Sequence, residues 1–149
     1  MDKPIFVYVT HINATPEKVW EALTQPEFTR QYWGGRQIQS DWTKGASVKF
    51  IKPDGGIDLK GEVLEADPPR RLSYTWSCPA CFGGPPENTT RVTFEIAETL
   101  GVTKLTVTHD GFEPGSKLFV EINKGWQAIL SNLKTLLETG KPLPFTRQC

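Results

Sequence analysis

His109 is the residue best suited by type to move a proton, because an imidazole titrates near neutral pH. It shares a predicted strand face with Leu105 and Val107 and precedes Asp110-Gly111-Phe112, where a cavity mouth could lie. Catalysis would need a second group, and the carboxylates nearest to strand positions are Asp41, Asp58, Glu62 and Glu65. Nothing in the sequence places one of them against His109. We expect a buried structural histidine more readily than a catalyst, and no other catalytic candidate.

Cys78 and Cys81 have the C-x-x-C spacing of redox and zinc sites. A redox pair gains reactivity from a helix N-terminus, but the residues that follow, Phe82-Gly83-Gly84-Pro85-Pro86, prevent a helix. A zinc site takes four ligands, and the remaining candidates, His11, His109 and Cys149, form no second pair. The chain also lacks the G-x-S-x-G, P-loop, G-x-G-x-x-G and H-E-x-x-H motifs. We therefore expect no metal, no cofactor, and inert thiols or an adventitious disulfide.

Aromatic residues are the compositional feature that points to binding, with five Trp, eight Phe and three Tyr among 149 residues. Such side chains either fill a core or supply the flat apolar lining of a small-molecule pocket. Tyr32, Trp33 and Trp42 fall around two predicted short helices and the first hairpin, a natural entrance. The residues that we expect to contact a ligand are Trp20, Tyr32, Trp33, Trp42, Trp76, Phe82, His109, Phe112, Gly125, Trp126 and Ile129.

A long amphipathic helix from Ser116 to Gly140 must position several of these residues. Its apolar positions recur at helical spacing: Leu118, Ile122, Trp126, Ile129, Leu133, Leu136 and Leu137. Ser116 is a suitable N-cap and Gly140 a suitable C-terminal stop. Gly125 in mid-helix costs about 1 kcal/mol relative to Ala, so either the sheet approaches closely there or a ligand occupies the space. Trp126 is then either a pocket wall or a core residue.

The preceding residues predict a sheet that the long helix can cover. Residues 4–12 read as a strand, Thr15-Pro16-Glu17 opens a helix, and Pro26 opens a second one to about Gln31. Later strands are expected at 47–52, 57–66, 70–77, 89–97 and 102–109, separated by turns or, at 78–88, by a loop. Strands joined by short turns form an antiparallel meander. Residues 141–149 lack periodicity and predict a flexible tail.

The order of these elements and several short motifs resemble the START-like (SRPBCC) superfamily. Within it, the chain is similar to the C-terminal domain of the activator of the ninety-kilodalton heat-shock chaperone ATPase. The matching residues are Ala14 to Trp20, Tyr32-Trp33-Gly34, Gly61 through Pro69 with Arg71-Leu72, Tyr74-Thr75-Trp76, His109 to Phe112, and Gly125-Trp126 with Leu130, Leu133 and Leu137. The resemblance covers nearly the whole chain.

The resemblance implies an α+β helix-grip fold, in which a curved antiparallel sheet of six or seven strands wraps the long C-terminal helix. It does not fix function, because the superfamily includes ligand carriers, polyketide cyclases, oxygenase subunits and chaperone cofactors. We expect a single domain over residues 1–149 that holds a small hydrophobic or aromatic ligand between sheet and helix. The alternatives are a regulator of a chaperone ATPase and a cyclase- or hydrolase-like enzyme that uses His109.

The charge and composition of the chain restrict the kinds of partner that we expect it to bind. Lys plus Arg equals Asp plus Glu at 17 each, so neither nucleic acid nor an anionic membrane is the expected partner. No apolar run reaches the roughly 18 residues of a membrane span, and the N-terminus MDKPIFVYVT lacks a signal-peptide pattern. Three cysteines are an odd number for a secreted disulfide framework. These features predict a cytoplasmic protein whose partner is a small hydrophobic molecule or a chaperone.

Overall fold

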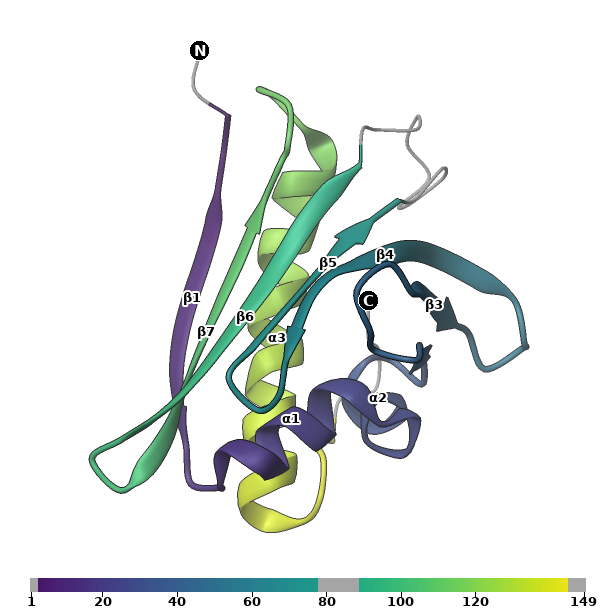
Figure 1. Ribbon diagram of the computed structural model, residues 1–149. Helices are drawn as coiled ribbons and strands as arrows, with labels where there is room; N and C mark the ends of the chain where they lie inside the picture. Colours follow the sequence, from purple (N-terminus) through teal and green to yellow (C-terminus); the bar gives the residue numbers. More distant parts are fainter. Residues whose placement is uncertain (1–2, 78–88, 145–149) are drawn as a thin grey trace.

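The computed structural model describes residues 3–77 and 89–144, which fold into one curved sheet and three helices (Figure 1). The elements in chain order are β1 (Phe6–Ile12), α1 (Pro16–Thr24), α2 (Pro26–Tyr32), β2 (Gln37–Gln39), β3 (Ser47–Ile51), β4 (Ile57–Asp67), β5 (Arg71–Trp76), β6 (Thr90–Thr99), β7 (Val102–Asp110) and α3 (Lys117–Thr139). The predicted elements are confirmed to within a few residues at their ends.

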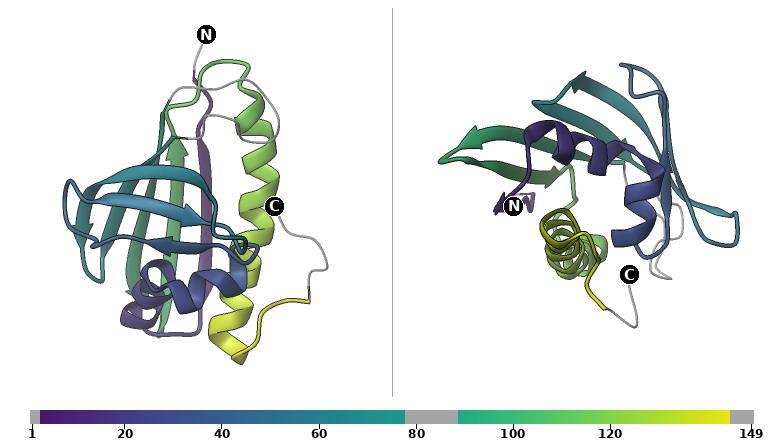
Figure 2. Two further views of the ribbon diagram at one scale, coloured as in Figure 1. Left: turned by 90° about the vertical axis from the view of Figure 1, so that its right-hand side faces the viewer. Right: turned by 90° about the horizontal axis from the view of Figure 1, so that it is seen from below.

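The seven strands form one antiparallel sheet in the order β1-β7-β6-β5-β4-β3-β2. Every neighbouring pair except β1 and β7 is consecutive in sequence, as expected for a meander. The sheet curls into a half-barrel, and α3 lies along its concave side, while α1 and α2 close the lower end (Figure 2). This arrangement confirms the predicted α+β helix-grip fold.

Local sequence signals set the helix boundaries. The Thr15 hydroxyl accepts a hydrogen bond from the Lys18 N–H at 3.2 Å, and Pro16 opens α1. At the start of α3 the Ser116 hydroxyl accepts from the Phe119 N–H at 3.0 Å. Gly140 ends the helix in the left-handed region, at φ 83°, which a glycine adopts without steric cost.

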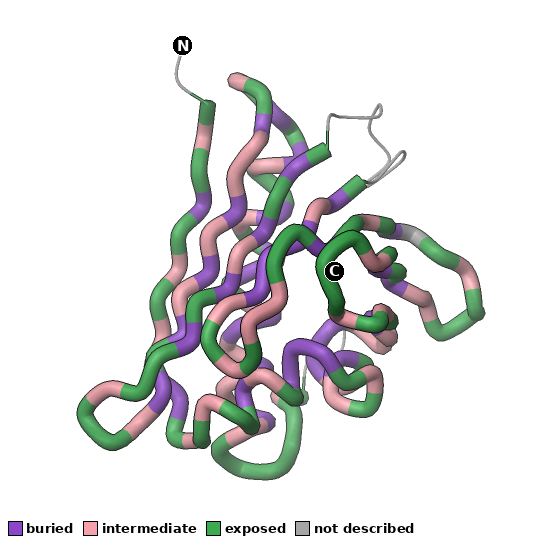
Figure 3. The backbone as a smooth tube through the Cα atoms, viewed as in Figure 1, coloured by how far each residue is buried: buried purple, intermediate pink, exposed green. Residues whose placement is uncertain are grey.

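The alternation along the strands separates a buried concave face from a solvated convex face (Figure 3). On β1, Phe6 and Ile12 point inward, whereas Val7 and Val9 remain 58% and 48% exposed. The sequence did not determine this choice, because both alternating sets of β1 are apolar. The register places Phe6 opposite His109 and His109 opposite Val92, so these side chains share the concave face.

The end of the chain returns along α3 for a short distance. The Leu143 N–H donates a hydrogen bond to Asn132 Oδ1 at 2.6 Å, and Leu143 is half-buried. Of the segment expected to be a flexible tail, only residues 141–144 fall within the described structure. No described helix combines the length and the apolar character that crossing a membrane requires.

Candidate functional site

Six aromatic side chains meet between the sheet and α3, and we call them the aromatic cluster. Each is at most 5% exposed. They come from the α2–β2 connection, β3, β5, β6 and α3, and they are Trp33, Phe50, Tyr74, Trp76, Phe94 and Trp126. The cluster therefore joins both walls of the helix-grip fold.

Trp126 is the contribution of α3 to the aromatic cluster. Its ring stacks on Trp76 at a centroid distance of 5.6 Å and makes edge contacts with Trp33 at 5.2 Å and Phe94 at 6.0 Å. Ring pairs at these separations stabilise beyond their buried area. The indole of Trp126 thus links the helix to β5, β6 and the end of α2.

Trp33 enters the cluster from neither the sheet nor α3. It follows α2 as its C-cap residue and contacts Phe50 edge-on at 5.2 Å and Trp76 at 5.8 Å. Gly34 and Gly35 come next, with φ values of 63° and 82°. Trp33 is therefore inserted between sheet and helix by a short connection that includes two residues in the left-handed region.

His109 lies at the edge of the cluster with both ring nitrogens engaged. Nδ1 accepts a hydrogen bond from the Trp126 indole N–H at 3.0 Å, so the ring proton of the neutral imidazole lies on Nε2. Nε2 is 2.8 Å from the Thr90 hydroxyl and donates to it. The ring also packs against Trp76 at 4.7 Å and Phe112 at 4.5 Å.

Burial governs the protonation of His109. The side chain is fully buried, and desolvation lowers its pKa to about 3, against the smaller opposing effect of Asp110. A neutral histidine with both nitrogens hydrogen-bonded has no free lone pair with which to accept a proton from a substrate. No described carboxylate hydrogen-bonds to it, so the geometry favours the structural role over the catalytic alternative.

Further polar groups of this interior include the hydroxyls of Tyr32 and Tyr74 and the indole N–H of Trp76. The Tyr32 hydroxyl donates to the Ala22 carbonyl oxygen at 2.6 Å. Burial raises the pKa of Tyr74, while the nearby Trp76 indole acts to lower it. The buried Trp76 Nε1 lies near the Tyr74 hydroxyl, but it meets no acceptor within hydrogen-bond geometry among the described residues.

Trp42 connects this interior to the surface. Its ring lies 5.7 Å from that of Tyr74, and its indole N–H donates to the Thr24 carbonyl oxygen at 3.0 Å. Trp42 has φ 56°, a conformation that a bulky side chain rarely adopts. On its outer side is a hollow of about 430 Å³ lined by Thr24, Gln25, Pro26, Gln39, Ser40, Asp41, Trp42, Ser47 and Lys49.

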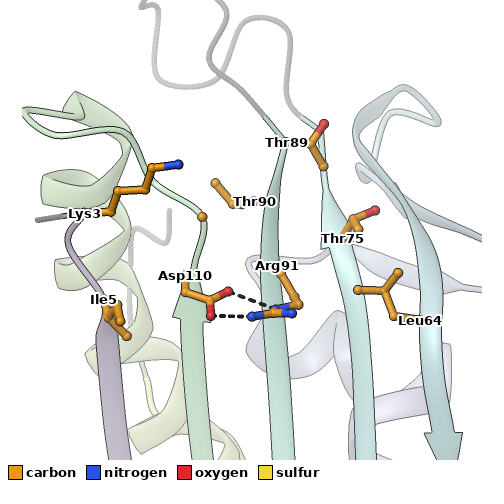
Figure 4. A pocket seen from close by; sticks show the side chains of 9 residues that line it. Lys3, Ile5, Leu64, Thr75, Thr89, Thr90, Arg91 and Asp110 are labelled. Atoms are coloured by element: carbon orange, nitrogen blue, oxygen red, sulfur yellow. Dashed lines mark hydrogen bonds and ion pairs between the residues drawn. The ribbon is translucent and has the colours of Figure 1, made fainter.

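A separate open depression of about 450 Å³ lies on the convex face of the sheet. Figure 4 shows its lining side chains, with Arg91 and Asp110 paired across β6 and β7. The guanidinium donates to both carboxylate oxygens, at 3.0 and 2.7 Å. Since this pair satisfies its own charges and lies outside the half-barrel, we do not assign the ligand site here.

The structure brings together most of the residues expected at a ligand site. Trp33, Trp76 and Trp126 belong to the cluster, and His109 and Phe112 adjoin it. Further residues of the expected set also lie near it: Tyr32 at the end of α2, Trp42 between β2 and β3 against Tyr74, and Gly125 and Ile129 buried on α3.

Among the expected site residues that the structure describes, Trp20 is not part of this group. Trp20 is half-buried on α1 and makes no ring contact among the described residues. Phe82 lies outside the described residues, as do Cys78 and Cys81. Within the described residues, no group of three or more His, Cys, Asp or Glu side chains could hold a metal ion.

Sequence reasoning did not include Phe50, Tyr74 and Phe94 among the site residues. The available signal was strand alternation: Tyr74 shares the predicted buried face of β5 with Trp76, and Phe94 occupies the buried face of β6. Alternation identified these residues as buried but could not show which buried rings converge.

Comparison with known structures supports this fold over most of the chain. Protein MLL2253 from Mesorhizobium loti is 29% identical with a TM-score of 0.76, over 90% of this chain and 96% of that one. ChR145 from Cytophaga hutchinsonii is also 29% identical, with a TM-score of 0.75 over 94% of this chain and 98% of that one. DynU16, a protein in the dynemicin biosynthetic locus, is 27% identical with a TM-score of 0.75, over 93% of this chain but 48% of its own.

No protein with curated function matches the chain significantly. The family model for activator of Hsp90 ATPase homolog 1-like proteins matches residues 13–138, which include every strand except β1, the helices α1 and α2, and all of α3 but its last residue. The curled antiparallel sheet around a long C-terminal helix agrees with that match. The chain therefore belongs to the family of activator of Hsp90 ATPase homolog 1-like proteins, within the START-like superfamily.

Proposed function

We propose that this protein binds a small, flat, apolar or aromatic compound within the aromatic cluster, between the sheet and α3. The observation that carries the proposal is the convergence of six aromatic side chains from both walls of the fold. Planar rings present large apolar faces that a second planar molecule can stack on. This fold often binds hydrophobic ligands, and the likeness to DynU16, a protein of a biosynthetic locus, supports a small-molecule ligand.

The proposal includes a route into the cluster. All six rings are buried, so a ligand must displace at least one of them. Trp33 is the best placed to move, because its backbone continues into Gly34 and Gly35 rather than into a strand. Trp42 separates the outer hollow from Tyr74, and we propose that ligands enter there.

A screen of flat apolar compounds is expected to raise the melting temperature of the purified protein. At a ligand concentration of about 100 times Kd, the free energy of unfolding increases by about 2.7 kcal/mol. For a chain of this size that corresponds to roughly 5–10 °C. Native mass spectrometry should show one bound molecule. In ¹H–¹⁵N spectra, the indole signals of Trp33, Trp76 and Trp126 should shift, and that of Trp20 should not.

Two phenylalanine variants provide the matched control. Phe94→Leu removes a ring that contacts both Tyr74 and Trp126 and should weaken binding roughly three- to tenfold, the worth of one aromatic pair. Phe28→Leu changes a half-buried ring of α2 outside the cluster and should leave affinity within about twofold. Equal effects of the two variants, or a screen in which no compound shifts the melting temperature, would rule out binding in the cluster.

A second candidate function is regulation of a chaperone ATPase. It is supported by the family match and by three exposed apolar side chains in the β1 region: Ile5, Val7 and Val9 are 57%, 58% and 48% exposed. β1 is an edge strand of the sheet. A row of exposed apolar residues at a sheet edge is suited to contact with another protein.

The chaperone proposal has a direct kinetic test. Saturating protein is expected to increase the ATP turnover of the ninety-kilodalton heat-shock chaperone, and Val7→Asp with Val9→Asp should abolish the increase. Both positions are exposed, so the double variant should retain the melting temperature to within a few degrees. An ATPase rate that stays unchanged at saturating protein would eliminate this function.

A further inference from the structure

Trp76 carries a buried hydrogen-bond donor that has no acceptor within hydrogen-bond geometry among the described residues. The side chain is 3% exposed, and its Nε1 finds no partner among the described residues. A buried indole N–H normally has a partner, because leaving it unpaired forfeits the hydrogen bond it makes with water in the unfolded chain. An unpaired donor inside a candidate binding region therefore requires an explanation.

Two other indoles in or beside the cluster show the usual arrangement. The Trp126 N–H donates to His109 Nδ1 and the Trp42 N–H donates to the Thr24 carbonyl oxygen, both at 3.0 Å. Trp76 is surrounded instead by rings, with Trp33, Phe50, His109 and Trp126 at centroid distances between 4.7 and 5.8 Å. These rings supply flat apolar contacts, and none of them pairs with the Trp76 N–H.

Tyr74 places a second polar hydrogen near this donor. Tyr74 and Trp76 are two residues apart on β5, so both side chains point to the concave face. The proximity is also apparent from the pKa of Tyr74, which burial raises and which a weaker hydrogen-bonding influence of the Trp76 indole N–H acts to lower. The two groups are thus close, although they fall outside hydrogen-bond geometry with each other.

We infer that the Trp76 indole N–H, assisted by the Tyr74 hydroxyl, binds an acceptor oxygen on the ligand, and that the ligand is therefore a planar aromatic ketone or quinone. This inference rests on the proposed function and specifies its ligand class. The oxygen belongs to a neutral group, because the buried polar side chains among the described residues are Thr, Ser, Asn and His, with no Lys or Arg. A carboxylate would be desolvated there without a cation.

A pair of isosteric probes tests the inference. Fluorene and 9-fluorenone have the same ring system and differ by one carbonyl group. Calorimetric titration of the wild-type protein should show roughly three- to tenfold tighter binding of 9-fluorenone, the worth of one neutral hydrogen bond. Trp76→Phe removes the N–H and should reduce this preference to within about twofold, and Tyr74→Phe should reduce it partially. Trp20→Phe, outside the cluster, should preserve it.

A spectroscopic measurement on the wild-type protein tests the same hydrogen bond without any variant. The carbonyl stretch of 9-fluorenone should move to lower frequency when it binds the wild-type protein, because a donor on the oxygen weakens the C=O bond. Equal affinity for both probes, or a carbonyl stretch unchanged from that in apolar solvent, would overturn the inferred hydrogen bond from Trp76. It would leave the proposal of ligand binding intact. Failure of both probes to bind would overturn the inferred hydrogen bond and would also count against the proposed function.

Discussion

Gly61→Ala is expected to be severely destabilising, by at least about 3 kcal/mol. A Cβ at this position would lie 1.8 Å from the Thr75 carbonyl oxygen and 2.8 Å from its carbon. Both atoms are backbone, so no side-chain rotation can relieve the overlap, and β4 must move away from β5. Since about 1 kcal/mol shifts the melting temperature of a chain this size by roughly 2–4 °C, the expected decrease is about 6–12 °C or more.

Gly56→Ala is the matched control for this prediction. The nearest atoms to its Cβ would be Asp54 Oδ1 at 3.1 Å and Lys52 Cε at 3.2 Å, both in flexible exposed side chains that can move. Its melting temperature should therefore stay within a few degrees of wild type. A Gly61→Ala protein as stable as Gly56→Ala would contradict the close approach of β4 and β5. The result matters for the site because β5 carries Tyr74 and Trp76.

The second large effect is a loss of stability in acid caused by His109. In the folded protein its pKa is lowered to about 3 by burial, whereas an unfolded histidine titrates near pH 6.5. Between these values the unfolded chain binds a proton that the folded chain does not, so lowering the pH favours unfolding. The contribution is intact above pH 6.5 and is lost progressively toward pH 3. At about 1.4 kcal/mol per pH unit, it amounts to roughly 2.5 kcal/mol by pH 4.5.

His109→Asn isolates this contribution. Asparagine does not titrate, and its side-chain oxygen can replace Nδ1 as the acceptor for the Trp126 N–H. Urea unfolding at pH 7 and pH 4.5 should show a smaller loss for the variant than for wild type, by about 2.5 kcal/mol. Carboxylates affect both proteins alike and cancel in the comparison. A loss of the same size in both proteins, or titration of the folded His109 ring signals near pH 6.5, would contradict the buried neutral state.

Local sequence signals were sufficient to predict most of the secondary structure. Thr15, Ser116 and Gly140 predicted helix ends that the structure confirms, because caps act on backbone groups within one turn. Strand alternation predicted the buried faces of β5 and β6 for the same reason, since it depends on the two-residue period of a single strand. The resemblance then supplied the helix-grip arrangement, which the sheet order and the family match confirm.

The same local signals predicted only part of the candidate site. Its aromatic character follows from composition, and Trp33, Trp76 and Trp126 were among the expected residues. The inward face of β1 was not determined, because both of its faces are apolar, and burial depends on what packs against the strand. The role of His109 also depended on its surroundings, since its spacing from Leu105 and Val107 is compatible with either a buried or a catalytic residue.

The sequence by itself determined where this chain forms helices and strands, which strand faces are apolar, and that aromatic residues are abundant. Only the tertiary structure decided that Trp33, Trp76 and Trp126, from distant parts of the chain, contact one another. It also decided that His109 is neutral and that the Trp76 N–H forms no hydrogen bond within the part of the chain that the structure describes. The physical reason is that desolvation and hydrogen-bond pairing depend on every group within a few ångströms, and most of those groups come from other elements.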